Sequence, residues 1–278
     1  MELAYYNGWL GPLEEAVVPV NDRGYIFGDG VYEVIRAYNG VMFALAEHLK
    51  RLAASAGAVQ IPLPWGLTEL EDIAAGVLSQ SGIKEAVIYI QVTRGTAPRS
   101  HLPAAVLRPN LLITVRHITG ISPEVYSEGV KVITMPEFRW EMRHVKSISL
   151  QAGVLAKYKA QQAGAAEAVF ILPDGTVTEC ASSNIFIVKN GVLMTHPADQ
   201  RILAGVLRQS VLEVAASQEL EVKVKPFKIS DLMLAEEVFI TGTVTEIMPV
   251  VNVDGNIVGD GKPGPVTRRI HAGYAALR

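Results

Sequence analysis

The sequence is poor in the residues that build cross-linked or metal-centred proteins. It has one cysteine, Cys180, among 278 residues, which excludes a disulfide framework and a zinc site made of thiolates. Its six histidines do not follow the HxxxH or HExxH spacing, which lets two rings reach one metal ion from a helix. No metal site is therefore predicted.

Charge is also scarce and evenly spread. Charged residues make up 19% of the chain and the net charge is −3. There is no basic stripe and no acidic tail, so neither a nucleic-acid surface nor a strongly charged partner is indicated.

Long apolar runs are missing as well. The longest stretch without charge, residues 52–68, is interrupted by two glycines and two prolines, whereas a membrane-spanning helix needs about 20 apolar residues. The N-terminal stretch MELAYYNGWLGPLEE carries acid rather than base and does not resemble a signal peptide. We therefore expect a soluble cytoplasmic protein.

Apolar residues, in contrast, are abundant at 49% of the chain. A chain of this length forms one or two domains and buries a sizeable core. With so few charges, the composition also predicts that part of the surface is buried in an oligomer interface.

The pattern of turns and apolar residues predicts mixed α and β structure in two halves, an α/β or α+β fold. We expect a smaller N-terminal domain over 1–119, a linker over 120–123 and a larger C-terminal domain over 124–278. The linker is placed at the sequence Gly-Ile-Ser-Pro, which is typical of a boundary.

Individual elements are expected at the following positions. In the first half, a hairpin over 31–45 turns at Asn39-Gly40, and a capping box of Thr68 and Glu71 opens a helix. The other elements of this half are strands over 5–10, 86–93 and 110–118 and helices over 47–58 and 68–80. The second half contains strands over 130–135, 168–172, 176–188, 221–224 and 237–241 and helices over 150–162 and 205–217.

The Gly28-Asp29-Gly30 sequence is a weak match to a dinucleotide-binding loop. Glu33 stands where the third glycine of GxGxxG belongs, and a hairpin is predicted to follow instead of a helix. A nicotinamide-dependent oxidoreductase is therefore a minor alternative. Cys180 has no neighbour that would activate it as a nucleophile, and we expect it to fill apolar space.

The strongest motif lies between Glu179 and Arg208. It reads Glu-Cys-Ala-Ser-Ser-Asn-Ile-Phe, then Leu-Met-Thr at 193–195, then Leu-Ala-Gly-Val-Leu-Arg at 203–208. This pattern resembles the signature of the class IV aminotransferases, which are pyridoxal-phosphate enzymes of fold type IV. The resemblance extends to DRGY at 22–25, FGDGVYE at 27–33, Glu47-His48 with Arg51-Leu52, and Lys146-Ser147. It implies the two-domain α/β fold of that family.

The resemblance implies two residues for the chemistry of pyridoxal 5'-phosphate. Lys146 would form the Schiff base and carry the proton, because pyridoxal chemistry needs one lysine for both tasks. Glu179 would lie beside the pyridine nitrogen and keep it protonated, since a carboxylate next to a cationic ring stays ionised.

The resemblance also implies a phosphate site. Gly205-Val206-Leu207 opens a predicted helix, and the free N–H groups at a helix start favour anions. The family match adds Arg51 and the loop Thr241-Gly242-Thr243. Two positions depart from the family pattern, in which we expect hydroxyl residues at 207 and 242. The set of cofactor residues is Lys146, Glu179, Arg51, Val206, Leu207, Gly242, Thr243 and Ser182.

Within the family, the sequence is most similar to D-amino-acid aminotransferases, because VTRG at 92–95 leads into PRSH at 98–101. The resemblance implies that Tyr32, Arg99 and His101 bind the substrate carboxylate, for which a planar guanidinium is suited. In that family the arginine and histidine come from a loop of the partner subunit. A homodimer with shared active sites is therefore expected.

The function implied is reversible ping-pong transamination between a D-amino acid and a 2-oxo acid. Alternatives within the family are a branched-chain L-amino-acid aminotransferase and an aminodeoxychorismate lyase, both disfavoured by the Arg99-x-His101 pair. A non-catalytic binding module is a further alternative, disfavoured because Lys146 and Glu179 are both present.

Overall fold

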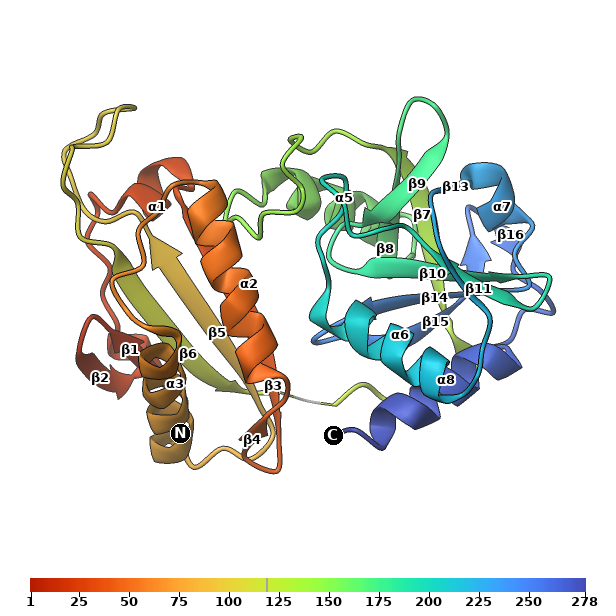
Figure 1. Cartoon of the computed structure of the whole chain (residues 1–278), viewed down its shortest axis with the longest axis horizontal. Helices are drawn as coiled ribbons and strands as arrows, with labels where there is room; N and C mark the ends of the chain where they lie inside the picture. The colour runs from red at the N-terminus through yellow and green to blue at the C-terminus, as the bar shows by residue number, and fades with distance from the viewer. Residues whose placement is uncertain (119) are drawn as a thin grey trace. The chain divides into compact units, whose positions relative to one another are not determined.

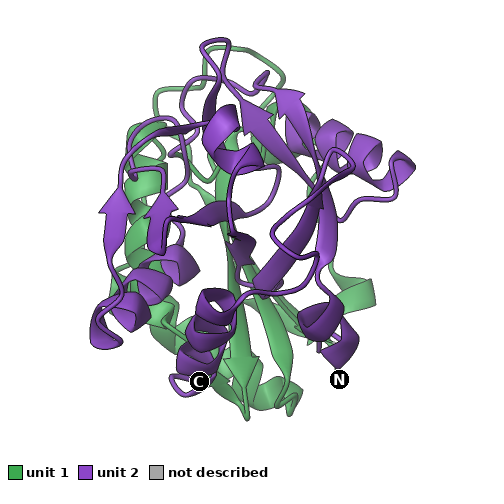
Figure 2. Cartoon of the chain, turned by 90° about the vertical axis from the view of Figure 1, so that its right-hand side faces the viewer, with its two compact units in different colours: residues 1–119, 145–150 green, residues 120–144, 151–278 purple. Residues whose placement is uncertain are grey.

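The computed structural model describes residues 1–118 and 120–278 and groups the chain into two compact units. The first unit combines Met1–Thr119 with Val145–Leu150, and the second combines Gly120–His144 with Gln151–Arg278 (Figure 2). Thr119, the predicted end of the first half, lies outside the described residues. The grouping differs from the predicted ranges at residues 145–150, which belong with the first unit.

The first unit is built on a six-stranded sheet in its described part, with strand order β2-β1-β6-β5-β3-β4 (Figure 1). All of these pairs are antiparallel. The strands are β1 (Leu3–Tyr6), β2 (Trp9–Pro12), β3 (Gly30–Tyr38), β4 (Val41–Met42), β5 (Ala86–Thr93) and β6 (Asn110–His117). The helical segments are η1 (Leu13–Glu15), α1 (Arg23–Phe27), α2 (Leu45–Ala58) and α3 (Leu67–Ser81).

Burial of aliphatic side chains explains where α2 and α3 lie. α2 packs against β3, while α3 packs against β6 and β1 (Figure 1). Ile35, Ile88 and Ile113 from three neighbouring strands are fully buried, as is Leu52 from α2. Removing this apolar surface from water is the main source of the unit's stability.

Residues 145–150 belong with the first unit because they satisfy an open strand edge. β4 pairs only with the last residues of β3, namely Ala37 and Tyr38. Near the start of β3, along the same edge, Tyr32 N–H donates to the Lys146 carbonyl at 3.0 Å, and Ile148 N–H donates to the Gly30 carbonyl at 3.1 Å. The segment thus supplies partners that an edge strand otherwise lacks.

The second unit contains a ten-stranded sheet, counted over the described residues. Its strand order is β12-β11-β10-β14-β15-β7-β8-β9-β13, and β16 pairs with β15. The strands are β7 (Val130–Pro136), β8 (Glu167–Ile171), β9 (Thr176–Cys180), β10 (Asn184–Lys189), β11 (Val192–Thr195), β12 (Val222–Val224), β13 (Phe227–Lys228), β14 (Glu237–Gly242), β15 (Glu246–Val253) and β16 (Asn256–Ile257).

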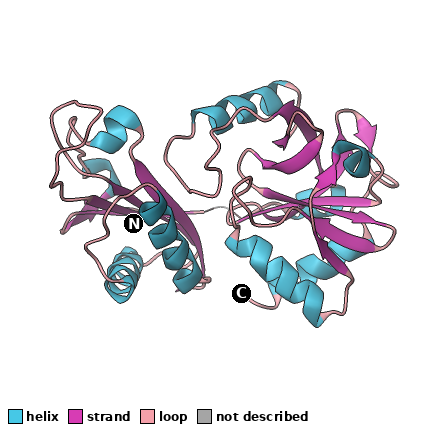
Figure 3. Cartoon of the chain, turned by 45° about the horizontal axis from the view of Figure 1, so that its top comes forward, coloured by secondary structure: helices cyan, strands magenta, loops and turns pink. Residues whose placement is uncertain are grey.

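Helices border this second sheet (Figure 3). They are α4 (Pro123–Glu128), α5 (Gln151–Gln162), α6 (Val206–Ser217), α7 (Ile229–Met233) and α8 (Pro265–Ala275). α6 and α8 pack on each other and on β14, whereas α5 packs on β7 and β8. Phe186 and Phe239, on neighbouring strands, stack with ring centroids 4.9 Å apart. Among the described residues, no helix is both long and apolar enough to cross a membrane.

Several expected elements are confirmed, and other details differ. The hairpin turns at Asn39-Gly40, where both residues have positive φ, as a type I′ turn requires. The capping box is wrong: α3 begins one residue earlier, after Gly66, without a side-chain cap. The strand expected at 5–10 is split between β1 and β2 by a turn with positive φ at Asn7 and Gly8, where the sequence carries an Asn-Gly turn signal. The β structure expected over 176–188 is likewise split between β9 and β10.

Candidate active site

Lys146 is held by backbone contacts on both sides. Its carbonyl accepts from the Tyr32 N–H, and its own N–H donates to the Ser55 hydroxyl of α2 at 3.1 Å. The half-buried side chain carries its Nζ 4.4 Å from the centroid of the Tyr32 ring, within cation–π range. Two predicted site residues, Lys146 and Tyr32, therefore lie in contact in the first unit.

Next to Tyr32 on β3, Glu33 points to the opposite face and is fully buried. Its carboxylate accepts from Arg51 Nε and Nη2, both at 2.7 Å, and lies 2.7 Å from His48 Nδ1. Burial raises the pKa of Glu33, but the hydrogen bonds of Arg51 and His48 and the nearby Lys146 outweigh it and lower the pKa to about 2. Glu33 therefore stays ionised and fixes Arg51, another predicted residue.

The predicted carboxylate-binding residues Arg99 and His101 lie on the loop between β5 and β6. Both are exposed. The Phe27 ring lies 5.3 Å from the Arg99 guanidinium carbon and 5.3 Å from the centroid of the His101 ring. The loop thus carries a guanidinium and an imidazole that contact the same aromatic ring, and a guanidinium is suited to binding a carboxylate.

Glu179, near the end of β9, is the centre of a buried polar group in the second unit. Its Oε1 accepts from Arg139 Nη1 at 2.7 Å, and its Oε2 accepts from Asn184 Nδ2 and Leu203 N–H, both at 3.0 Å. Burial raises the pKa of Glu179 to about 7 although Arg139 and the Leu203 N–H lower it, and Glu137 adds a further increase. The carboxylate is therefore only partly compensated by positive charge.

Arg139 was not identified from the sequence. It bridges two carboxylates, since its Nη2 and Nε also donate to Glu137 at 2.7 and 3.0 Å. Arg143 lies 3.3 Å from Glu137 and completes a row of alternating charges. The feature of the sequence that points to Arg139 is the run EFRWEMR at 137–143, which is unusually charged for this chain. Nothing in its spacing indicates Glu179, 40 residues away.

Ser182 follows β9 in the second unit. Its hydroxyl donates to the buried Glu167 carboxylate at 2.5 Å, and Ser183 donates to the same oxygen at 3.2 Å. Lys157 lies 3.7 Å from that oxygen. The predicted contact of Ser182 with a cofactor stays a prediction, because the described contacts of its hydroxyl are internal.

The start of α6 is formed as predicted from Val206 and Leu207. Gly205 is the N-cap, and no side chain caps the helix. A Cβ at Gly205 would lie 2.0 Å from the Asn184 Oδ1, so only glycine allows this close approach. The helix therefore begins with N–H groups that no side-chain cap satisfies, and such groups favour an anion.

The predicted residue Gly242 ends β14, and the predicted residue Thr243 begins the loop that follows. On either side of them, the hydroxyls of Thr241 and Thr245 are buried and have no hydrogen-bond partner among the described residues. A Cβ at Gly242 would lie 2.7 Å from the Thr245 hydroxyl. Buried hydroxyls without partners are costly, so this loop has unused capacity to bind a polar ligand.

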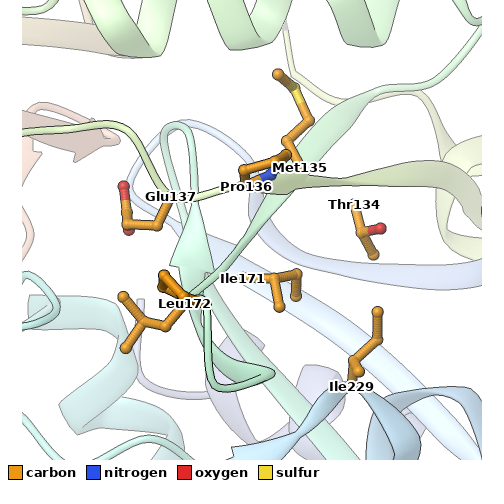
Figure 4. Close-up of a pocket in the computed structure, with 8 residues that line it drawn as sticks. Thr134, Met135, Pro136, Glu137, Ile171, Leu172 and Ile229 are labelled. Carbon is orange, nitrogen blue, oxygen red and sulfur yellow. The ribbon is translucent and has the colours of Figure 1, made fainter.

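A separate pocket of about 440 Å³ opens beside β7, β8 and α7 (Figure 4). It contains none of the predicted site residues. Glu137 lines it, but the Glu137 carboxylate is buried and bound to Arg139. The remaining lining residues are Thr134, Met135, Pro136, Ile171, Leu172, Pro173 and Ile229. We assign no chemistry to this mainly apolar surface.

Comparisons with known proteins identify relatives of this chain in sequence and in fold. The family model described as amino-transferase class IV matches residues 30–253. A D-alanine aminotransferase of Bacillus licheniformis is 41% identical over 266 residues, covering 95% of this chain and 93% of the relative. A D-alanine aminotransferase of Listeria monocytogenes is 42% identical over 267 residues, covering 95% and 92%.

Solved structures show the same likeness. A branched-chain amino acid aminotransferase from Escherichia coli matches with a TM-score of 0.91 at 28% identity, covering 99% of this chain and 94% of that one. The T.th. branched-chain amino acid aminotransferase, solved with pyridoxamine 5'-phosphate, matches with a TM-score of 0.91 at 29% identity, covering 99% and 93%.

Proposed function

The chain belongs to the amino-transferase class IV family, and on that premise we propose that it transfers the amino group of a D-amino acid to a 2-oxo acid. The observation that carries the choice of substrate is the identity of about 40% with D-alanine aminotransferases over 95% of the chain. The branched-chain enzymes share the fold at lower identity, 28–29%. The alternatives expected from the sequence are therefore less well supported.

We propose pyridoxal 5'-phosphate as the cofactor, and the residues present fit it. Glu179 is a buried carboxylate with a raised pKa and incomplete positive compensation, as suits a site that receives a cationic ring nitrogen. The unpartnered hydroxyls of Thr241 and Thr245 and the uncapped start of α6 suit a phosphate. Arg51, Val206, Leu207, Gly242, Thr243 and Ser182 complete the proposed cofactor residues.

When bound, this cofactor supplies an electron sink for the charge that develops at the substrate Cα. In this proposal the Lys146 amine takes the proton from the substrate Cα and would deliver it to C4′ of the cofactor. The hydrogen bonds of the Lys146 backbone to Tyr32 and Ser55 fix the main chain from which that amine projects. Glu179 stays ionised and holds a proton on the ring nitrogen. Arg139 maintains the orientation of Glu179 through their 2.7 Å bond.

Tyr32, Arg99 and His101 bind the substrate carboxylate in this proposal. A guanidinium and an imidazole offer N–H donors in different directions, and a hydroxyl adds a third. A carboxylate bound in this way fixes which face of Cα meets Lys146. The three residues therefore determine whether D- or L-amino acids react.

The test is a half-reaction without an acceptor. Purified holoenzyme is mixed with D-alanine or L-alanine, and the cofactor absorbance is followed. We expect rapid conversion with D-alanine and much slower conversion with L-alanine. Conversion with L-leucine or L-valine but not D-alanine would establish the branched-chain alternative, and release of pyruvate from aminodeoxychorismate would establish the lyase.

We also propose a homodimer in which Arg99 and His101 serve the partner's active site. Chains carrying Lys146→Ala and chains carrying Arg99→Ala are co-expressed with different tags, and hybrids are isolated. A shared site gives each hybrid one doubly damaged and one native site, so activity should return to about half that of the wild type. Hybrids no more active than their parents would show that Arg99 acts within its own chain.

We further propose that the enzyme works in the cytoplasm. Its single cysteine is buried and unpaired, which is usual in a reducing compartment. Fractionation of the source cells, followed by D-alanine transamination assays, would test this location.

A further inference from the structure

The β5–β6 loop that carries Arg99 and His101 is long and has little structure of its own. Residues 94–109 form no helix and no strand in the described chain, and loops of this length are usually functional. Between Pro98 and Arg108, the described residues show two hydrogen bonds to the backbone, and both come from one side chain. That side chain is Arg23.

Arg23 lies at the start of α1 and is 4% exposed. Its Nη1 donates to the Ser100 carbonyl at 2.6 Å and its Nη2 to the His101 carbonyl at 3.2 Å. These carbonyls belong to the two residues that follow Arg99, the second of which is His101. One guanidinium therefore fixes the backbone from which both substrate-binding side chains project.

The orientation of Arg23 is itself fixed by an ion pair. Its Nε donates to Asp29 at 2.8 Å, and Arg94 Nε donates to the same carboxylate oxygen at 2.8 Å. Arg94 is attached in turn to the end of α2, through the carbonyls of Gln60 and Val59. The Arg23 guanidinium is thus connected to α2 through Asp29 and Arg94. Its position therefore does not depend on the loop carbonyls to which it donates.

Phe27, one turn after Arg23, adds a side-chain contact to the backbone contacts. The Arg23 guanidinium lies 4.8 Å from the centroid of the Phe27 ring, and the Arg99 guanidinium lies 5.3 Å from it. The His101 ring is 5.3 Å away. Arg99 and His101 therefore share one aromatic support, whose position depends on α1.

The base of the loop is attached to the same segment. Arg23 N–H donates to the Gly95 carbonyl at 2.9 Å, and Ala97 N–H donates to the Asn21 carbonyl at 3.1 Å. Asp22 is buried and accepts from Thr93 and Asn110, the residues at which β5 ends and β6 begins. The α1 segment thus holds the loop at its base and at its middle.

Resting on the proposed function, we propose that Arg23 is a positioning residue that sets substrate-carboxylate affinity by holding Arg99 and His101 in place. Its role requires arginine, because three acceptors in different directions are served by one planar fork. Lysine has a single side-chain nitrogen. It would keep the ion pair with Asp29 but lose the hydrogen bonds to the loop carbonyls. The inference is the same whether the loop serves its own site or the partner's.

Arg23→Gln and Arg94→Gln form a matched pair for the test, since each removes one bond to Asp29 but only Arg23 bonds to the carbonyls of Ser100 and His101. KM and kcat for D-alanine are measured on each holoenzyme, together with amide hydrogen exchange of residues 96–108. For Arg23→Gln we expect KM to rise about tenfold to a hundredfold, kcat to change less than about threefold, and loop exchange to accelerate. Arg94→Gln leaves the bonds of Arg23 to Asp29 and to the loop carbonyls in place, so KM and loop exchange should change much less than in Arg23→Gln.

A double-mutant cycle shows whether Arg23 acts through Arg99. If it does, Arg23→Gln should raise KM by a smaller factor once Arg99→Gln is present, because only the part that acts through His101 remains. Additive effects, or identical behaviour of Arg23→Gln and Arg94→Gln, would overturn the inference. If Arg23→Gln does not fold, Arg23→Lys is used, for which a raised KM and faster loop exchange are again expected and unchanged values would overturn the proposal.

The same measurements separate this inference from the proposed function. A wild type that does not react with D-alanine, or an Arg99→Gln variant with unchanged KM, would contradict the proposed substrate and overturn the inference with it. When the wild type and Arg99→Gln behave as proposed, only the comparison of Arg23→Gln with Arg94→Gln decides about Arg23.

Discussion

Glu33 in the first unit and Glu179 in the second are both buried carboxylates bonded to an arginine, yet their pKa values move in opposite directions. The pKa of Glu33 falls to about 2 and that of Glu179 rises to about 7. Burial opposes ionisation at both residues. The difference must therefore come from what surrounds each carboxylate.

Glu33 accepts two hydrogen bonds from one arginine and lies beside two further groups. Arg51 gives it two hydrogen bonds, His48 lies within hydrogen-bond distance, and the charge of Lys146 adds to the attraction. Glu179 instead shares Arg139 with Glu137, whose negative charge works against ionisation.

The comparison shows that the negative charge of Glu33 is balanced by groups of the protein. The negative charge of Glu179 is balanced only in part and can accept a further positive group. The proposed ring nitrogen of the cofactor would supply that charge to Glu179. Glu33 needs no ligand, because its partners are all within its own unit. This difference can be tested in four ways, beginning with the largest expected effect.

Lys146→Ala should lower turnover by more than about 10⁴-fold, because it removes both the covalent attachment and the proton carrier, and general acid–base catalysis alone is worth about 10²–10⁴-fold. The Glu33 cluster should survive, since its three hydrogen bonds remain. Steady-state transamination and urea unfolding measure the two effects. Lys159→Ala, at an exposed position of α5, is the control, and near-normal multiple turnover of the Lys146 variant would place the reactive amine elsewhere.

Glu33→Gln should destabilise the protein by about 3–5 kcal/mol at pH 7, the usual cost of removing one partner from a buried ion pair. Arg51 would lose its buried counter-charge. Glu179→Gln is the matched variant and should cost less, because its carboxylate is poorly compensated. Urea unfolding of the cofactor-free proteins gives both values, and equal losses would contradict the assigned difference.

The two residues should also give opposite pH dependence. Both begin from an ordinary pKa of 4.5. The stability that Glu33 contributes is complete above pH 4.5 and is lost as pH falls towards 2. The stability that Glu179 contributes is complete below pH 4.5 and is lost as pH rises through 7. Each change amounts to about 3 kcal/mol.

The measurement is the free energy of unfolding of cofactor-free protein between pH 3 and 8. Glu33→Gln should remove part of the acid-side loss, and Glu179→Gln should remove part of the decline between pH 4.5 and 7. If Glu179→Gln leaves that slope unchanged, the carboxylate is not titrating in this range.

Glu179→Gln should slow removal of the Cα proton on the order of 10²-fold, similar to the loss of one preorganised electrostatic group elsewhere. A neutral amide keeps the shape of the residue but cannot hold the ring nitrogen protonated. Single-turnover reaction with D-alanine, followed by stopped flow, measures this step. An unchanged rate with cofactor still bound would rule out Glu179 as the ring partner.

Much of the local structure was predictable from the sequence. The apolar and β-branched run at 86–93 gave β5 with the predicted bounds, and Asn39-Gly40 fixed a hairpin turn. The capping box at Thr68 failed because a helix start one residue earlier puts this threonine inside the first turn. β15 and α8 were not predicted, since Pro249 and Gly273 interrupt their patterns.

The site was predictable only as a set of residue types. The motif from 179 to 208 and Lys146-Ser147 indicated which side chains are needed for the chemistry, because a cofactor demands an amine, an acid and phosphate ligands. The sequence could not indicate Arg139, which meets Glu179 across 40 positions. It also could not indicate that Arg23 holds the carbonyls of residues 100 and 101.

The sequence by itself therefore determined the family and the kind of reaction and predicted a set of residues for it, since these depend on chemical groups at fixed spacing. Tertiary structure alone decided the ionisation of Glu33 and Glu179 and the attachment of residues 145–150 to β3. The physical reason is that a pKa and a strand-edge contact depend on which groups folding brings within a few ångströms, and these groups are far apart along the chain.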